Sequence, residues 1–240
     1  MKRYSQGLLF RKEWYWFEDP RDIAGADMVN FFSYTKGEYE GFKRTSTLTS
    51  VIDLSCPLDE LWNGTRKKFI QKQIEQGRNR GVTVEKSIDF AAFRPLFKAF
   101  RKKKKLMRIP YRVLEQNGIL FLAKYEGKPI AGGIFIGDGV YIRAWVLASG
   151  RLEGSEGRMR DIFGSANRMV IWEAITYAKE HGYTLFDLGG IDPESANPSQ
   201  RSLAEFKEGF GGERKEAFYY YKVYAPLLKV WMRVRSLLLG

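Results

Sequence analysis

The chain has 240 residues, of which 44% are hydrophobic, and this fits one large domain with a real core, or one and a half small ones. Its single cysteine, Cys56, excludes an internal disulfide, and with the only histidine, His181, it cannot form a tetrahedral zinc site without carboxylates, so we expect no metal. The formal net charge of +12 favours polyanionic partners such as tRNA, a pyrophosphate-bearing substrate or an anionic membrane face, with a generically basic soluble protein as the alternative.

The first part of the chain, up to about residue 46, is rich in aromatic residues and is predicted to be irregular. Residues 1–62 are interpreted as an N-terminal extension packed on a core domain of residues 63–225. No sustained apolar segment follows the basic N-terminus, and no apolar run approaches the ~20 residues that span a bilayer. We therefore expect a cytoplasmic protein, one that meets a membrane only from its inner face.

The next elements alternate between strands and helices. Residues 45–54 predict a strand, residues 58–79 a helix with Leu61, Phe69 and Ile74 as core contacts, and residues 82–86 a short strand. Asp89 predicts the cap of a further helix with an apolar stripe of phenylalanine and leucine. That helix runs into five basic residues, 101–105, which are interpreted either as a phosphate-facing patch or as a solvated helix end.

The second half of the core predicts a meander followed by alternating helices and strands. Strands are expected at residues 119–125, 129–136 and 140–148, and residues 149–164, with four glycines, predict a mobile loop. A helix at 167–180 with an apolar stripe that faces the sheet, a buried strand at 184–188, a short helix at 199–208 and a last strand at 217–224 complete the order. This succession predicts an α/β fold with a mixed central sheet flanked by helices.

One stretch, from Asn167 to Gly212, carries a more specific pattern. A helix opens with Ala166-Asn167 and carries Trp172; the strand end reads Phe186-Asp187-Leu188-Gly189-Gly190; and the turn reads Phe206-Lys207-Glu208-Gly209-Phe210-Gly211-Gly212. This succession resembles the FemABX-type branch of the GNAT-like acyltransferases, whose members transfer amino acids from aminoacyl-tRNA to peptidoglycan precursors. The resemblance implies a GNAT-like acyltransferase fold.

The resemblance also implies site residues. In the family the lysine of the F-K pair is implicated in catalysis and the preceding phenylalanine contributes its backbone carbonyl, so Lys207 and Phe206 are the first catalytic candidates. A lysine at this turn can direct a compact positive charge at a developing oxyanion or at a tRNA phosphate. The alternative is an exposed helical lysine flanked by Glu205 and Glu208.

Other candidates follow from position in the predicted elements. Asp187, at the carboxyl end of a central strand, is expected either to orient or deprotonate the acceptor amine or only to shape the glycine turn. Arg168, in the predicted first helical turn, is a candidate for phosphate contact. Trp172 is expected to pack or to contact substrate, and Gly211 and Gly212 permit close approach of a substrate to the backbone.

Coenzyme A is disfavoured as the donor. GNAT enzymes that use coenzyme A bind its pyrophosphate with a Q/R-x-x-G-x-G/A loop. Residues 160–166 contain one residue more than this loop and lack its second glycine. The amides of residues 164–167 could still bind a phosphate. We therefore expect no cofactor, with aminoacyl-tRNA as co-substrate and acetyl-CoA or another acyl-CoA as the alternative.

The chain ends in a basic amphipathic stretch, residues 226–240, which is expected either to dock on its own domain or to contact an anionic membrane. The functional hypothesis is an aminoacyltransferase that moves an amino acid from aminoacyl-tRNA to an amine of a lipid-linked cell-wall precursor. The alternatives are an N-acyltransferase of the same fold that uses acyl-CoA or another carrier, and a non-catalytic module that binds tRNA or a membrane.

Overall fold

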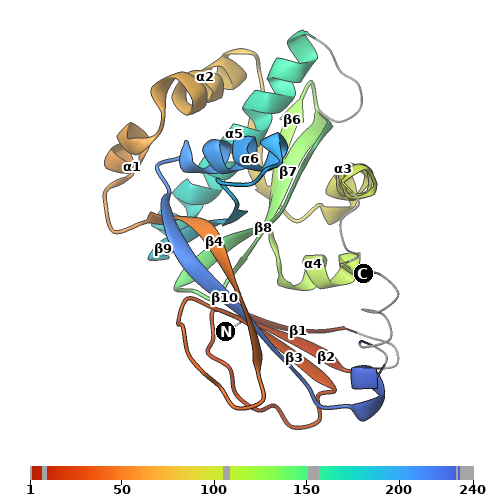
Figure 1. Ribbon diagram of the computed structural model, residues 1–240. Coiled ribbons are helices and arrows are strands. Elements are labelled where there is room, and N and C mark those ends of the chain that lie inside the picture. The colour runs from red at the N-terminus through yellow and green to blue at the C-terminus, as the bar shows by residue number, and fades with distance from the viewer. Residues whose placement is uncertain (1, 7–9, 105–108, 151–156, 231, 233–240) are drawn as a thin grey trace. The chain divides into compact units, whose positions relative to one another are not determined.

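The computed structural model describes residues 2–6, 10–104, 109–150, 157–230 and 232. The chain forms two compact units: unit 1 combines residues 1–48 with 216–240, and unit 2 is the segment 49–215. Strands β4 (Lys43–Asp53) and β10 (Glu213–Val223) contribute residues to both units (Figure 1). The domain boundaries predicted after residues 62 and 225 do not coincide with these unit boundaries and stay a prediction.

The sheet of unit 2 has the strand order β4-β9-β8-β7-β6-β5. Strands β5 to β8 form an antiparallel meander, and β9 pairs with β8 in parallel. The new strands are β5 (Thr83–Ser87), β6 (Ile119–Tyr125), β7 (Lys128–Gly137), β8 (Tyr141–Ser149) and β9 (Leu185–Ile191). The strands and the meander predicted from the sequence are therefore confirmed.

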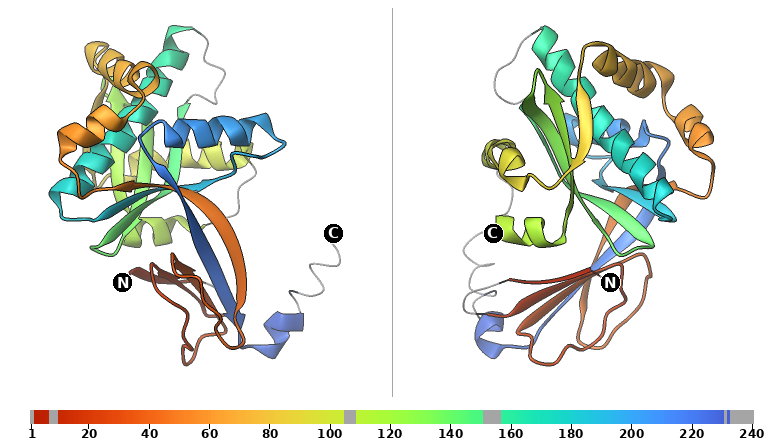
Figure 2. Two further views of the ribbon diagram at one scale, coloured as in Figure 1. Left: turned by 60° about the vertical axis from the view of Figure 1, so that its left-hand side comes forward. Right: turned by 180° about the vertical axis from the view of Figure 1, so that it is seen from behind.

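Helices cover both faces of this sheet (Figure 2). One face carries α5 (Arg158–Glu180) with α2 (Lys72–Asn79) behind it, and the other carries α3 (Phe90–Lys103) and α4 (Tyr111–Asn117). Alternate side chains of a strand point to opposite faces, and β6 shows this. Phe121 lies in the cluster under α5, whereas Leu120 lies in the cluster under α3.

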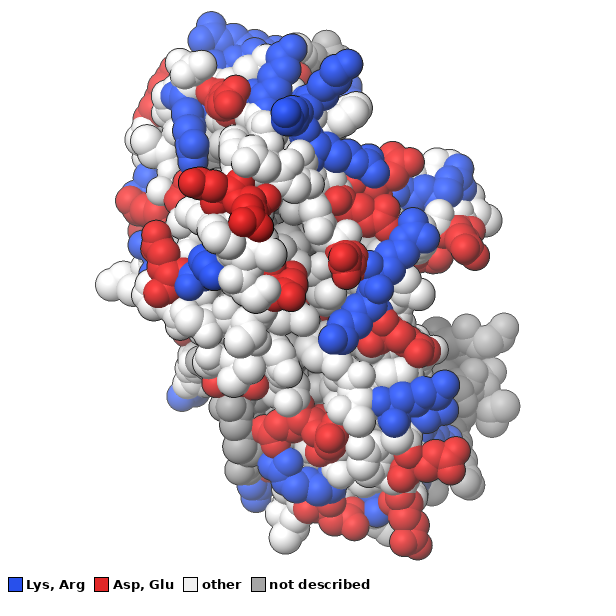
Figure 3. Space-filling model, turned by 90° about the vertical axis from the view of Figure 1, so that its left-hand side faces the viewer, with Lys and Arg blue, Asp and Glu red and all other residues white. Residues whose placement is uncertain are grey.

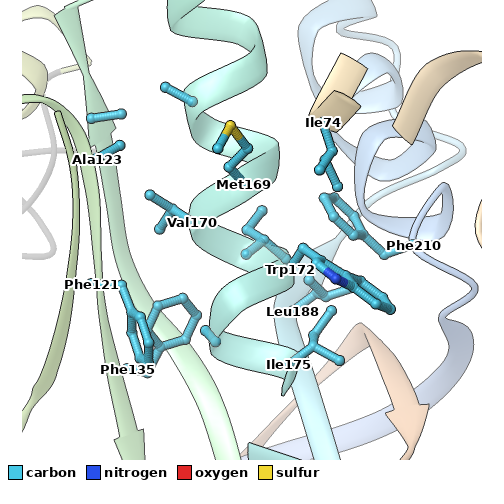
Figure 4. Packing of buried hydrophobic residues seen from close by; sticks show 14 of the residues in the cluster. Ile74, Phe121, Ala123, Phe135, Met169, Val170, Trp172, Ile175, Leu188 and Phe210 are labelled. Carbon is cyan, nitrogen blue, oxygen red and sulfur yellow. The ribbon is translucent and has the colours of Figure 1, made fainter. Parts of the chain in front are cut away.

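Helix α5 is the centre of the larger core (Figure 4). Met169, Val170 and Ile175 are buried, with strand residues on one side of the helix and Ile74 of α2 on the other. Burial of a full aliphatic side chain contributes roughly 1.5–3 kcal/mol, so this helix is stabilised by packing on both sides. The predicted α5 stripe and the buried position of Ile74 are confirmed.

The long helix predicted at residues 58–79 is broken into three pieces. They are α1 (Leu58–Gly64), a π-helix η1 (Lys67–Gln71) and α2. Thr65 and Arg66 between them have extended backbones, and the Thr65 hydroxyl donates a hydrogen bond to Trp62 O at 2.8 Å, which ends α1. Phe69 is 63% exposed, so its predicted place in the core is wrong.

Two other boundaries differ from the prediction. Helix α5 begins at Arg158 and not near residue 167, so the predicted loop is wrong for residues 158–164, and residues 151–156 lie outside the described part. Helix α4 was not predicted; it starts directly after Pro110, whose extended backbone supplies a helix start. Asp89 does cap α3 as predicted, because its carboxylate accepts a hydrogen bond from Ala92 N at 2.9 Å.

Unit 1 is a sheet with the order β1-β2-β3-β10, so the irregular structure predicted for the first 46 residues is wrong. Its further strands are β1 (Lys2–Gln6), β2 (Lys12–Trp16) and β3 (Met28–Ser33). In β2 a charged residue, Glu13, is fully buried, and its carboxylate accepts hydrogen bonds from the Tyr15 hydroxyl and Arg11. A charged residue at a buried position masks the alternation of apolar and polar residues that would indicate a strand.

The predicted C-terminal amphipathic helix falls mainly outside the described residues. Residues 226–230 and 232 are helical, and of these Leu228 is buried while Leu227 is exposed. Among the described residues, helices that combine the length and the apolarity needed to cross a bilayer are absent.

Candidate functional site

The site forms where the pairing of the parallel strands β8 and β9 ends. Their ladder joins Tyr141–Arg143 to Leu185–Asp187, although β8 continues to Ser149 and β9 to Ile191. Beyond the Arg143–Asp187 pair, β8 and β9 continue without backbone pairing to each other. Their backbone groups and side chains there line the end of the ladder. The carboxyl end of a central strand is where open α/β sheets present ligands.

A buried ion pair closes this end of the ladder. Asp187 is fully buried, and its carboxylate accepts hydrogen bonds from the Arg143 guanidinium, the Thr49 hydroxyl and, at 2.6 Å, Gly189 N. Arg143 is itself only 5% exposed. The carboxylate therefore shapes the glycine turn, as one of the two predicted interpretations has it, and it also neutralises a buried arginine.

Lys207 lies beside this pair, near the end of α6 (Pro198–Glu208). It is buried, and its ammonium donates a hydrogen bond to Gly190 O at 2.7 Å. Burial, and then the positive charge of Arg143, lowers the pKa of Lys207 to about 8 against the opposing effect of Asp187. A buried lysine aimed at a strand end is not the exposed helical lysine of the alternative interpretation.

Among the described residues, the amides that follow the last turn of α6 pass over one of its carbonyls. The amides of Gly209, Phe210 and Gly211 donate to the carbonyls of residues 205, 207 and 208 respectively, and pass over that of Phe206. Carbonyl groups in the last turn of a helix lack partners inside the helix, so the Phe206 carbonyl is a hydrogen-bond acceptor beside Lys207.

The two glycines of the turn are required by close packing within unit 2. Gly211 has a φ of 85°, and a side chain there would also lie 3.2 Å from Gly64 O. A Cβ on Gly212 would lie 2.2 Å from the Ser50 hydroxyl, which is buried and finds no hydrogen-bond partner among the described residues. These contacts explain the glycines by packing; substrate binding by Gly211 and Gly212 stays a prediction.

We expect Gly212→Ala to lower the free energy of unfolding by about 1–3 kcal/mol, because the added methyl overlaps the Ser50 hydroxyl. Adding Ser50→Ala is expected to recover most of this loss, since the Ser50 Cβ lies 3.5 Å away, an ordinary contact. Denaturant unfolding of the single and double variants measures both effects. Additive losses in the double variant would contradict the overlap.

Trp172 and Arg168 have mainly packing partners here. Trp172 is buried in the core against Trp62, with ring centroids 4.7 Å apart (Figure 4). Arg168 donates to Phe69 O at 2.7 Å and lies over the Phe206 ring at 5.2 Å. Substrate binding by these two residues stays a prediction.

The first-turn argument for Arg168 is wrong, because α5 starts at Arg158, ten residues earlier. The same boundary corrects the phosphate site expected at the amides of residues 164–167. These amides lie inside α5, where backbone N–H groups bond to carbonyls four residues earlier.

Sequence reasoning missed Arg143, Thr49 and Ser50. A detectable signal existed for Arg143: it is a charged residue within an apolar strand, and a buried charge requires a partner. Thr49 and Ser50 lie in a strand of ordinary composition, so nothing in the pattern separates them from neighbouring residues.

Comparison with known proteins tests the resemblance to the FemABX-type branch. Residues 129–225 match the family model described as the FemAB family. This stretch, which is less than half of the chain, is similar to the FemAB family, and we call it the FemAB-family segment. This segment begins in β7 and ends just after β10, so it contains Arg143, Asp187 and Lys207 but not Thr49 or Ser50. The resemblance to the FemABX-type branch is thereby confirmed.

Solved structures extend the likeness beyond the FemAB-family segment. A crystal structure of FemX superposes with a TM-score of 0.62 at 14% identity, covering 93% of this chain and 83% of that one. The C-terminal domain of a putative lysylphosphatidylglycerol synthetase from Agrobacterium fabrum gives 0.55 at 12% identity, covering 89% and 73%. L-PGS from Bacillus licheniformis gives 0.52 at 15% identity, covering 86% and 71%. These superpositions confirm the predicted α/β, GNAT-like fold. The comparison with curated protein sequences finds no match.

Proposed function

We propose that this protein is an aminoacyltransferase that moves an amino acid from aminoacyl-tRNA to an amine of a lipid-linked cell-wall precursor or a similar acceptor. The observation that carries the proposal is Lys207: it is buried at the end of the β8–β9 ladder, has a lowered pKa and occupies the F-K-x-x-F-G-G turn of the FemAB-family segment. The net charge of +12 suits a polyanionic donor.

The proposed reaction is attack of the acceptor amine on the ester carbonyl that joins the amino acid to tRNA. A C–N bond forms, the ester C–O bond breaks, and the proton lost by the amine reaches the departing ribose oxygen. The Lys207 ammonium has three hydrogens, and in the described part of the chain one of them bonds to Gly190 O. The others serve the developing oxyanion, where a preorganised positive charge is most effective in a buried site.

Phe206 and Asp187 take supporting roles in the proposal. The Phe206 carbonyl accepts a hydrogen bond from the attacking amine, which orients its lone pair toward the ester. Asp187 already accepts three hydrogen bonds, from Thr49, Arg143 and Gly189 N, and these bind its carboxylate into the ion pair and the glycine turn. We therefore give it the positioning of Gly189 and Arg143.

The test is transfer of radiolabel from a mixed pool of charged tRNA to lipid-linked precursor, run beside labelled acetyl-CoA with the same acceptor. Because two of the structural relatives are a putative lysylphosphatidylglycerol synthetase domain and L-PGS, phosphatidylglycerol serves as a second acceptor. Label arriving from tRNA in the wild type and not in Lys207→Met supports the proposal. Label arriving from acetyl-CoA alone would contradict it and favour a CoA-dependent acyltransferase.

A further inference from the structure

The π-helix η1 presents an aromatic ring to solvent in a basic surface. Phe69 is 63% exposed, whereas the next residue, Ile70, is buried and anchors the segment in the core. The other exposed residues between positions 66 and 72 are all cationic, namely Arg66, Lys67, Lys68 and Lys72, and the exposed Glu75 follows one helical turn later. Figure 3 shows the left-hand side of the view in Figure 1, and Lys and Arg side chains gather over its upper part, with Asp and Glu side chains among them. We call Phe69 with these four cations the η1 patch.

Two contacts tie the η1 patch to the turn that carries Lys207. Arg66 N donates to Gly209 O at 2.9 Å, which joins the start of η1 to the F-K-x-x-F-G-G turn. Arg168 donates to Phe69 O and lies over the Phe206 ring at 5.2 Å, so one guanidinium joins η1 to the residue before Lys207. The patch is therefore held next to the candidate site by defined contacts within unit 2.

An exposed aromatic ring among cations suits a nucleobase flanked by phosphates. Bases stack on aromatic side chains with little sequence preference, and lysine and arginine beside them neutralise the backbone. A membrane surface is the competing ligand for such a patch. It is disfavoured because an interfacial helix buries an apolar face in the lipid, whereas Phe69 is the one exposed apolar side chain in the described segment 66–72.

We propose that Phe69 stacks on a base of the single-stranded 3′ end of the donor tRNA, and that Arg66, Lys67, Lys68 and Lys72 bind its phosphates. This inference rests on the proposed function and adds to it the surface that holds the donor. An aminoacyl ester at the end of the RNA strand then lies on the side of η1 that faces the Lys207 turn. Within η1 the Phe69 ring is exposed to solvent, whereas the neighbouring Ile70 lies in the core.

The test uses the full chain and two RNA probes, uncharged tRNA and a short single-stranded RNA with the 3′-terminal sequence of tRNA. We expect Phe69→Ala to weaken binding of both by roughly 5- to 150-fold, the range for loss of one base–aromatic stack, and Phe69→Trp to bind as tightly as the wild type. Ile88→Ala is the matched control, because Ile88 is 94% exposed and lies before α3. Fluorescence anisotropy at fixed salt measures all four proteins.

Charge is tested separately through salt dependence. Lys67→Gln combined with Lys68→Gln is expected to reduce the slope of log affinity against log salt by about 0.7 for each phosphate that the variant no longer neutralises. Lys98→Gln combined with Arg112→Gln, two exposed cations on α3 and α4, is the matched control and should leave the slope unchanged. Equal slopes for the two double variants would overturn the phosphate-binding role of η1.

The outcomes separate this inference from the proposed function. Phe69→Ala with wild-type RNA affinity and wild-type transfer from tRNA would overturn the stacking role and leave the function standing. If Phe69→Ala loses binding to vesicles of phosphatidylglycerol while its RNA binding is unchanged, the η1 patch is a membrane contact. That result would also overturn the stacking role. A wild type that binds neither RNA probe but transfers label from acetyl-CoA would overturn both proposals together.

Discussion

Lys207→Met is expected to reduce transfer by about 10²–10³-fold, the loss typical when one preorganised donor to an oxyanion is removed. Methionine fills a similar volume without charge, so the loss reports the ammonium and not a cavity. The same variant is expected to be more stable than the wild type. Holding a lysine charged with a pKa of about 8 where the ordinary value is 10.5 costs about 3 kcal/mol at neutral pH.

The contribution of Lys207 to the free energy of unfolding depends on pH. Below pH 8 Lys207 is protonated both folded and unfolded, so the penalty is fully present. Between pH 8 and 10.5 the unfolded chain binds the proton and the folded protein does not, so this residue makes stability rise with pH. The difference in unfolding free energy between wild type and Lys207→Met should therefore shrink across that window. A constant difference would contradict the burial of the ammonium.

Activity should respond in the opposite direction. If the charged lysine is the active form, transfer by the wild type falls as pH rises through about 8, after correction for spontaneous ester hydrolysis. Lys207→Arg, which stays protonated, is the control that should lose this alkaline limb. An alkaline limb that persists in Lys207→Arg would assign the titration to another group.

Asp187→Asn is expected to lower the free energy of unfolding by about 3–5 kcal/mol, because it removes the carboxylate from a buried arginine. Asparagine keeps an oxygen for the Thr49 hydroxyl and Gly189 N, so the loss reports the contact with Arg143, both its charge and its hydrogen bond. Urea unfolding followed by circular dichroism measures it. The control is Glu85→Gln, which breaks the more exposed Lys124–Glu85 pair at 2.6 Å and should change stability by about 0–1 kcal/mol.

A second variant covers the case in which Asp187→Asn does not fold. Arg143→Met combined with Asp187→Leu removes both charges and replaces them with apolar groups, so it should be more stable than Asp187→Asn alone. If Asp187→Asn and Glu85→Gln cost the same, the Arg143–Asp187 pair contributes no more than a surface contact, and its role in shaping the site would fail.

The sequence pattern predicts the elements of unit 2 well because their signals are local. The strand at residues 119–125, the apolar stripe of α5 and the Asp89 cap each depend on residues a few positions apart, and each is confirmed. The break between α1 and α2 was missed because the hydroxyl of Thr65 bonds back to Trp62 O, and threonine within a helical pattern does not by itself mark an end.

The candidate site is only partly predictable for a related reason. Lys207, Phe206 and Asp187 lie in one recognisable stretch, so their sequence neighbours identify them. Arg143 reaches Asp187 from a strand 44 positions earlier, and Thr49 from one 138 positions earlier. Pairings over such distances are fixed by strand order and register, and these depend on the whole sheet.

The strand pairing in unit 1 delays the folding of this unit during translation. Strand β3 pairs with β10, for example Ser33 with Phe218, so one partner is made early and the other near the end of the chain. The aromatic residues of β2 and β3 leave the ribosome long before β10 can cover that edge. Unit 2 can gather its own strands in the meantime, so an interrupted translation product would expose an unpaired, aromatic strand edge and be prone to aggregate.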